Sequence, residues 1–92
     1  MPSIFKIGGF SVFFWSNEQG EPIHVHISKG NPSKASTKVW LTSAGGCLVA
    51  NNGAFISPSQ LNEILDILAA QFPDVCSAWK QHFNVDTIKY FC

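Results

Sequence analysis

Two histidines separated by a single residue, His24 and His26, are the feature of this sequence best suited to chemistry. They lie within the otherwise aliphatic segment 23–27, directly after a polar stretch that carries Glu18 and Glu21. Successive side chains of a strand point to opposite faces, so both imidazoles share one face and the aliphatic side chains share the other. We therefore expect the histidines to be half-exposed on the outer face of a sheet.

Metal binding is one use of this pair. A divalent metal such as zinc takes three or four ligands in most protein sites, and His24 and His26 would supply two of them from one strand. Other donors would have to complete the set, and the sequence offers several candidates: Glu18, Glu21, His82 and the cysteines. A divalent metal is thus the cofactor that the sequence allows, with its further ligands left open.

Acid–base catalysis is a second use. One neutral and one protonated imidazole can act as base and acid, because the pKa of histidine is about 6.5. In a small ribonuclease, His24 and His26 would be the catalytic pair, with Glu21 as a further catalytic candidate. A cation would also be needed at the scissile phosphate, and Lys29 and Lys38 are the lysines at hand.

The pair also fits roles without catalysis. His24 and His26 would pack on Trp40 or hydrogen-bond Glu18 and Glu21, and would thereby set the conformation of the preceding loop. Alternatively, these residues form a binding face for a protein partner, with Glu18, both histidines and Trp40 as its contacts. On an outer face, replacing both histidines by alanine should change the free energy of unfolding by less than about 1 kcal/mol.

Strand patterns fill the first half of the chain. Five segments are predicted as strands and are joined by turns rich in glycine and asparagine: 3–7, 10–15, 23–28, 37–42 and 47–50. Gly8-Gly9 is a two-residue hairpin signal, since glycine accepts the positive φ that such turns require. These short connections predict an antiparallel meander of four or five strands.

Helical periodicity begins after the strands. Ser57-Pro58-Ser59-Gln60 combines an N-cap serine, a proline at the first helical position and a glutamine three residues after the cap. An apolar stripe at three- and four-residue spacing follows: Leu61, Ile64, Leu65, Leu68, Phe72, Val75, Cys76, Trp79 and Phe83. Pro73 interrupts it, because proline cannot donate a backbone hydrogen bond. We predict one helix bent at Pro73, or two consecutive helices, ending at Asn84.

These elements predict a single α+β domain over residues 1–92, with the helical segment packed on one face of the sheet. Trp15 and Trp79 are expected in the core, with Trp15 as an alternative member of the histidine face. The apolar tail 85–92 is expected to add an edge strand or to contact a partner.

Composition narrows the class of function. Six lysines balance six acidic residues and arginine is absent, so nucleic acid is disfavoured as a partner. A chain this apolar and this short favours a protein partner or self-association. No apolar run is long enough to span a membrane, and three cysteines without paired spacing favour reduced thiols in the cytoplasm.

Several segments resemble a small bacterial family, the domain-of-unknown-function family 4160. They are Met1-Pro2-x-Ile4, Ile7-Gly8-Gly9-Phe10-x-x-Phe13-Phe14-Trp15-Ser16-Asn17-Glu18, Glu21-Pro22-x-His24-Val25-His26 and Lys38-Val39-Trp40-Leu41, with Leu61-x-x-Ile64 and Ala78-Trp79-x-x-x-Phe83 in the helical part. The resemblance implies a cytoplasmic protein encoded beside another small protein, proposed as a toxin–antitoxin component, and it assigns no catalytic residue. Ile23, where a second proline is common, and the tail 85–92 depart from the family pattern.

Taken together, the residues and the resemblance predict an interaction protein that binds a partner, or a second copy of itself, through a histidine- and tryptophan-bearing sheet face. The alternative is a small ribonuclease of toxin type that depends on histidine or on a metal.

Overall fold

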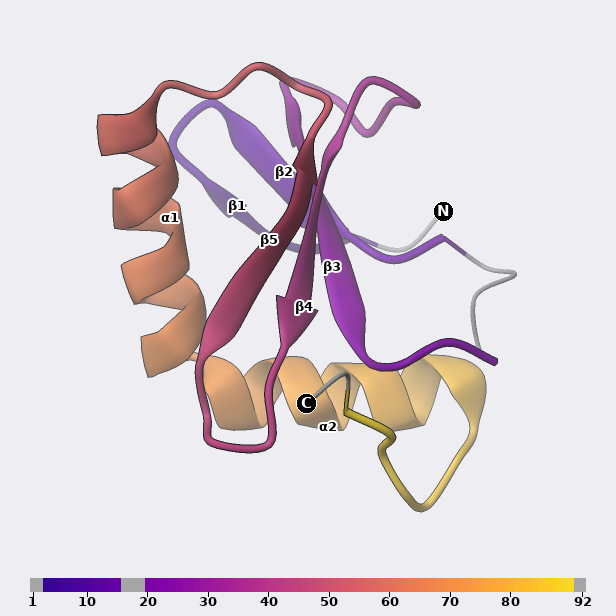
Figure 1. The fold of residues 1–92 in the computed structure, drawn as a ribbon. Helices are drawn as coiled ribbons and strands as arrows, with labels where there is room; N and C mark the ends of the chain where they lie inside the picture. The colour runs from indigo at the N-terminus through magenta and orange to yellow at the C-terminus, as the bar shows by residue number, and fades with distance from the viewer. Residues whose placement is uncertain (1–2, 16–19, 91–92) are drawn as a thin grey trace.

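A computed structural model describes residues 3–15 and 20–90 of the chain, with side chains from residue 6 onward. Five strands form one antiparallel sheet in the order β1-β2-β3-β4-β5, followed by two helices (Figure 1). The strands are β1 (Ser3–Ile7), β2 (Phe10–Phe13), β3 (His24–Lys29), β4 (Thr37–Leu41) and β5 (Cys47–Asn52). The predicted α+β fold and its meander are confirmed. The β1–β2 hairpin turns at Gly8, whose φ of +56° is a conformation that glycine adopts without steric cost.

Two helices follow, α1 (Pro58–Ala70) and α2 (Phe72–Phe83). Of the two predicted arrangements, one bent helix or two consecutive helices, the second is confirmed. The Ser57 hydroxyl caps α1 by accepting a hydrogen bond from the Gln60 N–H. The break falls at Gln71, two residues before the predicted bend, because Pro73 lies in the first turn of α2, where no intrahelical donor is needed. The second helix ends at Asn84, which is left-handed with φ 54° and ψ 50°. Neither described helix is long and apolar enough to cross a membrane.

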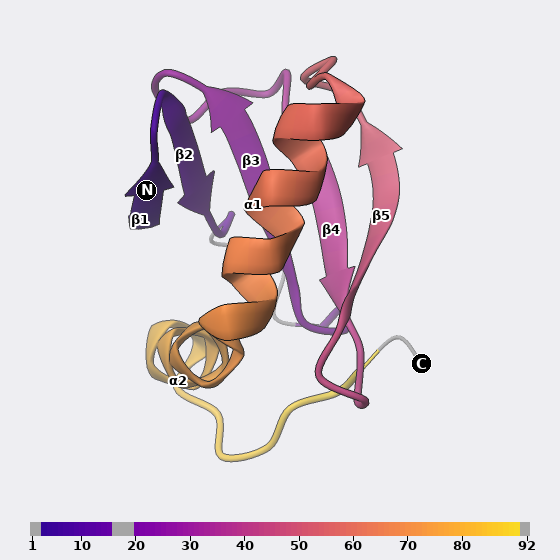
Figure 2. The ribbon, with the colours of Figure 1, turned by 90° about the vertical axis from the view of Figure 1, so that its left-hand side faces the viewer.

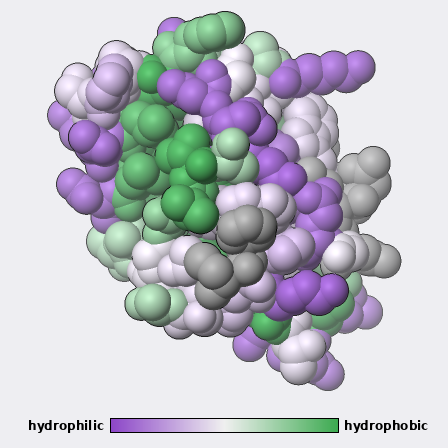
Figure 3. Space-filling view, in the orientation of Figure 1, coloured by the Kyte–Doolittle hydropathy of each residue, from purple (hydrophilic) through white to green (hydrophobic). Residues whose placement is uncertain are grey.

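The helices cover only one face and one end of the sheet. Helix α1 lies across a sheet face, and α2 runs past the end of the sheet (Figure 2). Hydrophobic side chains gather where α1 meets β5, and hydrophilic side chains dominate on the other side of the strands (Figure 3). The buried core contains Val12, Phe14, Ile23, Val25, Ile27, Val39, Leu41, Ile64, Leu68, Val75, Trp79 and Phe83.

The chain after α2 folds back onto the domain instead of forming the predicted edge strand. Its described part, residues 85–90, contains no strand, and the Ile23 N–H donates a hydrogen bond to the Lys89 carbonyl at 2.8 Å. The ring of Tyr90 stacks on Phe72 with 6.4 Å between centroids. The tail therefore packs against its own core beside the start of β3.

Candidate functional site

Strand register places the predicted site residues in two rows across the sheet. One row runs from Phe13 through His26 and Lys38 to Asn51. The next row runs through His24, Trp40 and Leu48. Residues directly opposite each other in an antiparallel ladder share a face, so both rows lie on the face opposite α1. We call this the His/Trp face, defined by Trp15, His24, His26, Lys38, Trp40 and Leu48.

Both histidines lie on the predicted face, but the prediction that they are half-exposed is wrong. His24 has no exposed surface and His26 retains 7%. Aromatic rings enclose them: the His24 ring lies 5.3 Å from Trp40 and 5.4 Å from Trp79, measured between centroids. Trp79 comes from α2, so the end of the helical layer reaches around to this face. The small stability change expected for a double alanine variant no longer follows, because both rings are buried.

The contacts of His26 continue this enclosure towards β2. Its ring stacks on Phe13 at 5.7 Å and meets Trp15 at 6.0 Å between centroids. Trp15 is half-buried, so it belongs to the His/Trp face and not to the core. The core prediction holds for Trp79, which is 3% exposed.

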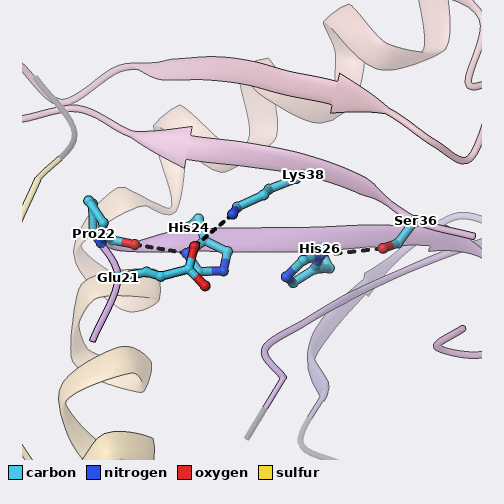
Figure 4. Close-up of polar contacts among 6 residues, drawn as sticks. All are labelled: Glu21, Pro22, His24, His26, Ser36 and Lys38. Atoms are coloured by element: carbon cyan, nitrogen blue, oxygen red, sulfur yellow. Dashed lines mark hydrogen bonds and ion pairs between the residues drawn. The ribbon is translucent and has the colours of Figure 1, made fainter. Parts of the chain in front are cut away.

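Hydrogen bonds fix the orientation of the two imidazoles (Figure 4). Nδ1 of His24 lies 2.8 Å from the Pro22 carbonyl oxygen. Since a carbonyl oxygen can only accept, the His24 Nδ1 atom carries the proton. Nδ1 of His26 lies 3.3 Å from the Ser36 hydroxyl oxygen. The loops on either side of β3 thus each hold one ring in place.

An ion pair joins the loop before β3 to β4. Lys38 Nζ donates to Glu21 Oε1 at 2.8 Å, and the same ammonium lies 4.3 Å from the centroid of the Trp40 ring. The hydrogen bond from Lys38 lowers the pKa of the Glu21 carboxyl below its usual value, although partial desolvation opposes this shift. Glu21 therefore lies near the histidines as predicted and is held there by Lys38. Glu18 falls outside the described residues.

A groove of about 320 Å³ opens on the His/Trp face. Its lining comes from β3, β4, β5 and two loops: Trp15, His26, Lys34, Ser36, Lys38 and Asn51. Sequence reasoning missed Lys34, Ser36 and Asn51. The outward position of Asn51 could have been found from strand alternation and from its pairing with Lys38. Nothing local to the 31–36 loop signals that Lys34 and Ser36 would meet these strands.

The described residues do not complete a metal site around the histidine pair. Within residues 3–15 and 20–90, no group of three His, Cys, Asp or Glu side chains is arranged to hold a metal. His82, a predicted further ligand, stacks on Phe14 with 5.7 Å between centroids. Lys29, a predicted phosphate-binding cation, contacts the Phe55 carbonyl instead, at 3.4 Å. Only Lys38 of the two lysines lies beside the histidines.

Residues 9–80 match a family model described as a domain of unknown function, DUF4160. The chain belongs to the DUF4160 family. This confirms the resemblance, and the match includes both histidines and every groove residue of this DUF4160 protein. No curated protein and no solved structure matches the chain.

Proposed function

We propose that this DUF4160 protein is an interaction module that binds a protein partner through the His/Trp face. The observation that carries the proposal is the position of Leu48, which is 45% exposed and lies directly opposite Trp40 in the row that contains His24. An exposed aliphatic side chain beside a half-buried tryptophan is the composition of an interface centre.

Polar side chains border this apolar centre. Lys38 lies over the Trp40 ring, and the next row of the sheet continues to Asn51. Partner interfaces combine an apolar centre with a polar rim, so the two rows together have the expected anatomy. Among the described elements, neither helix lies over this part of the sheet (Figure 1). The exposed Leu48 side chain is therefore available to a partner.

The partner that we propose is the product of a neighbouring gene, as in a toxin–antitoxin pair, or a second copy of the chain. Support comes from the family resemblance for the gene pair and from the apolar composition for association in general. The free thiols of Cys47 and Cys76 are consistent with a cytoplasmic location, which belongs to the same proposal.

A His-dependent ribonuclease is the second candidate, favoured by the juxtaposition of His26, Lys34 and Lys38 in one groove. Acid–base cleavage requires two groups that reach the substrate. His24 has no exposed surface and its Nδ1 proton is donated to Pro22, so His26 would need a different acid–base partner. The geometry therefore supports binding better than it supports catalysis by the histidine pair.

A matched pair of aliphatic substitutions tests the interaction proposal. Leu48→Glu places a charge at the proposed interface, and Ile67→Glu places the same charge on α1 at similar initial exposure, 45% against 38%. The chain would be co-expressed with the protein encoded beside it, and the complex would be measured by light scattering after gel filtration. We expect Leu48→Glu to weaken the complex by about tenfold or more, as for a central interface residue, and Ile67→Glu to leave it intact.

Three further outcomes complete the test. Loss of the complex in Ile67→Glu, with Leu48→Glu unaffected, would move the interface to the apolar surface between α1 and β5 and refute the proposal. If the chain dimerises alone and Leu48→Glu dissociates the dimer, the partner is a second copy. Expression alone, with growth and RNA integrity followed, addresses the second candidate: RNA cleavage that disappears in His26→Ala would favour the ribonuclease.

A further inference from the structure

The groove on the His/Trp face carries one positive charge that no described carboxylate neutralises, that of Lys34, because Lys38 is paired with Glu21. Two lysines, a histidine, a serine and an asparagine line it together with Trp15, and none of the lining residues that the structure describes is a carboxylate. Concave sites lined by one sign of charge concentrate ligands of the opposite sign. The lining of the groove therefore favours an anionic group with several hydrogen-bond acceptors.

Lys38 is positioned to take part in such binding while it holds Glu21. An ammonium group has three N–H donors, and the contact with Glu21 Oε1 uses one of them. The Lys38 side chain is 20% exposed, and its position over the Trp40 ring limits its conformational freedom. The entropy lost when this lysine binds a ligand is reduced accordingly.

The other donors come from the loop before β4 and from β5. Lys34 is exposed and makes no ion pair with any described residue. The Asn51 Oδ1 atom accepts a hydrogen bond from the Gly53 N–H at 3.2 Å, which leaves its amide nitrogen as a donor. Ammonium and amide donors from separate elements thus converge on one hollow.

The size and charge of the groove favour a carboxylate of a protein over a nucleic acid. A volume of about 320 Å³ accommodates one or two side chains. Nucleic-acid binding requires a row of cations along several phosphates, whereas four of the six lysines lie outside the groove and arginine is absent. Lys34, together with the N–H donors of Lys38 that Glu21 does not use, matches a single acidic side chain.

We propose that this groove binds an aspartate or glutamate side chain of the protein partner, with Lys34 and Lys38 as its cationic contacts and Trp15 as its wall. This inference rests on the proposed function and names the chemistry of the partner: an acidic segment next to an apolar residue that meets Trp40 and Leu48. The partner's carboxylate would lie beside the Glu21–Lys38 pair and share the Lys38 ammonium with it.

A capped hexaglutamate peptide is the probe, with hexaglutamine as the uncharged control and a short single-stranded RNA as the nucleic-acid control. Binding would be followed by NMR from the Trp15 indole N–H and from the Lys34 and Lys38 backbone amides. We expect hexaglutamate alone to shift these signals, with an affinity that falls as salt is added. Lys34→Gln should weaken binding by about two- to fivefold, the range for a partly exposed charge pair.

Lys80→Gln is the matched control, because it removes the same charge from α2 without touching the groove. Equal weakening by Lys80→Gln and Lys34→Gln would show attraction to net charge only and would overturn the inference. Stronger binding of RNA than of hexaglutamate would overturn it in favour of phosphate recognition. Failure of hexaglutamate to bind, with the partner complex still sensitive to Leu48→Glu, refutes the acidic contact and leaves the proposed function standing.

Discussion

The two faces of β3 are equally buried but are covered by different chemistry. Val25 and Ile27 face α1 and have no exposed surface, and His24 has none on the opposite face. Apolar side chains, among them Ile64, Leu68 and Val75 of the helices, pack with the first face, whereas aromatic rings and two loop hydrogen bonds cover the second. Burial alone therefore does not separate core from candidate site in this domain. The difference lies in whether the covering groups are apolar throughout or include donors and acceptors that a ligand can use.

A consequence is that the two faces should respond differently to substitution. On the helix-covered face, truncating a side chain should lower the free energy of unfolding, because buried apolar contacts are lost. On the His/Trp face, loss of a buried ring such as His24 should lower the free energy of unfolding, whereas loss of the exposed Lys34 side chain at the groove should cost only binding.

The largest effect is expected on the helix-covered face. Leu68 of α1 has no exposed surface and packs in the core. Leu68→Ala should reduce the free energy of unfolding by about 2–5 kcal/mol, because it removes buried methyl groups and leaves a cavity. Urea unfolding followed by circular dichroism measures this loss. A change below about 1 kcal/mol would mean that α1 is not packed on the sheet as the structure shows.

His24→Ala should have an intermediate effect, of about 1–3 kcal/mol, because it removes a buried ring and leaves the Pro22 carbonyl without its donor. His24→Phe is the matched control: it keeps an aromatic ring between Trp40 and Trp79 but cannot donate to Pro22. Unfolding measurements on both variants separate packing from hydrogen bonding. Loss of less than about 0.5 kcal/mol in both would place His24 on an exposed face after all.

The smallest effect concerns the Glu21–Lys38 pair at the edge of the groove. Because the folded protein lowers the pKa of Glu21, the pair stabilises the fold above the unfolded pKa, and this contribution is lost as pH falls through the folded pKa. The Glu21 side chain is 42% exposed, so we expect less than about 1 kcal/mol.

Comparison of wild type with Lys38→Gln at neutral pH and at a pH below the folded pKa of Glu21 tests this expectation. The difference in unfolding free energy should be larger at neutral pH, since only the ion pair depends on Glu21 ionisation. The contact of Lys38 with Trp40 is lost at both pH values and cancels in the comparison. A carboxyl titration of Glu21 by NMR that does not shift upward in Lys38→Gln would contradict the pairing.

Much of the fold was predictable because its signals are local. The Gly8-Gly9 turn, the capping serine at Ser57 and the left-handed end at Asn84 act within a few residues, and all three lie where the sequence places them. The break between the helices was displaced to Gln71, because a proline is tolerated in the first turn of a new helix and does not mark the break itself.

The sequence by itself determined which residues of β3 share a face, because strand alternation depends only on the local backbone. It separated the histidines from the aliphatic residues correctly. Only the tertiary structure decided how deeply each face is buried and what meets it. Trp79 encloses His24 from a distant helix, and Lys34, Lys38 and Asn51 converge on one groove from a loop and two strands. Such contacts depend on how non-adjacent elements pack, and no short-range spacing along the chain encodes them.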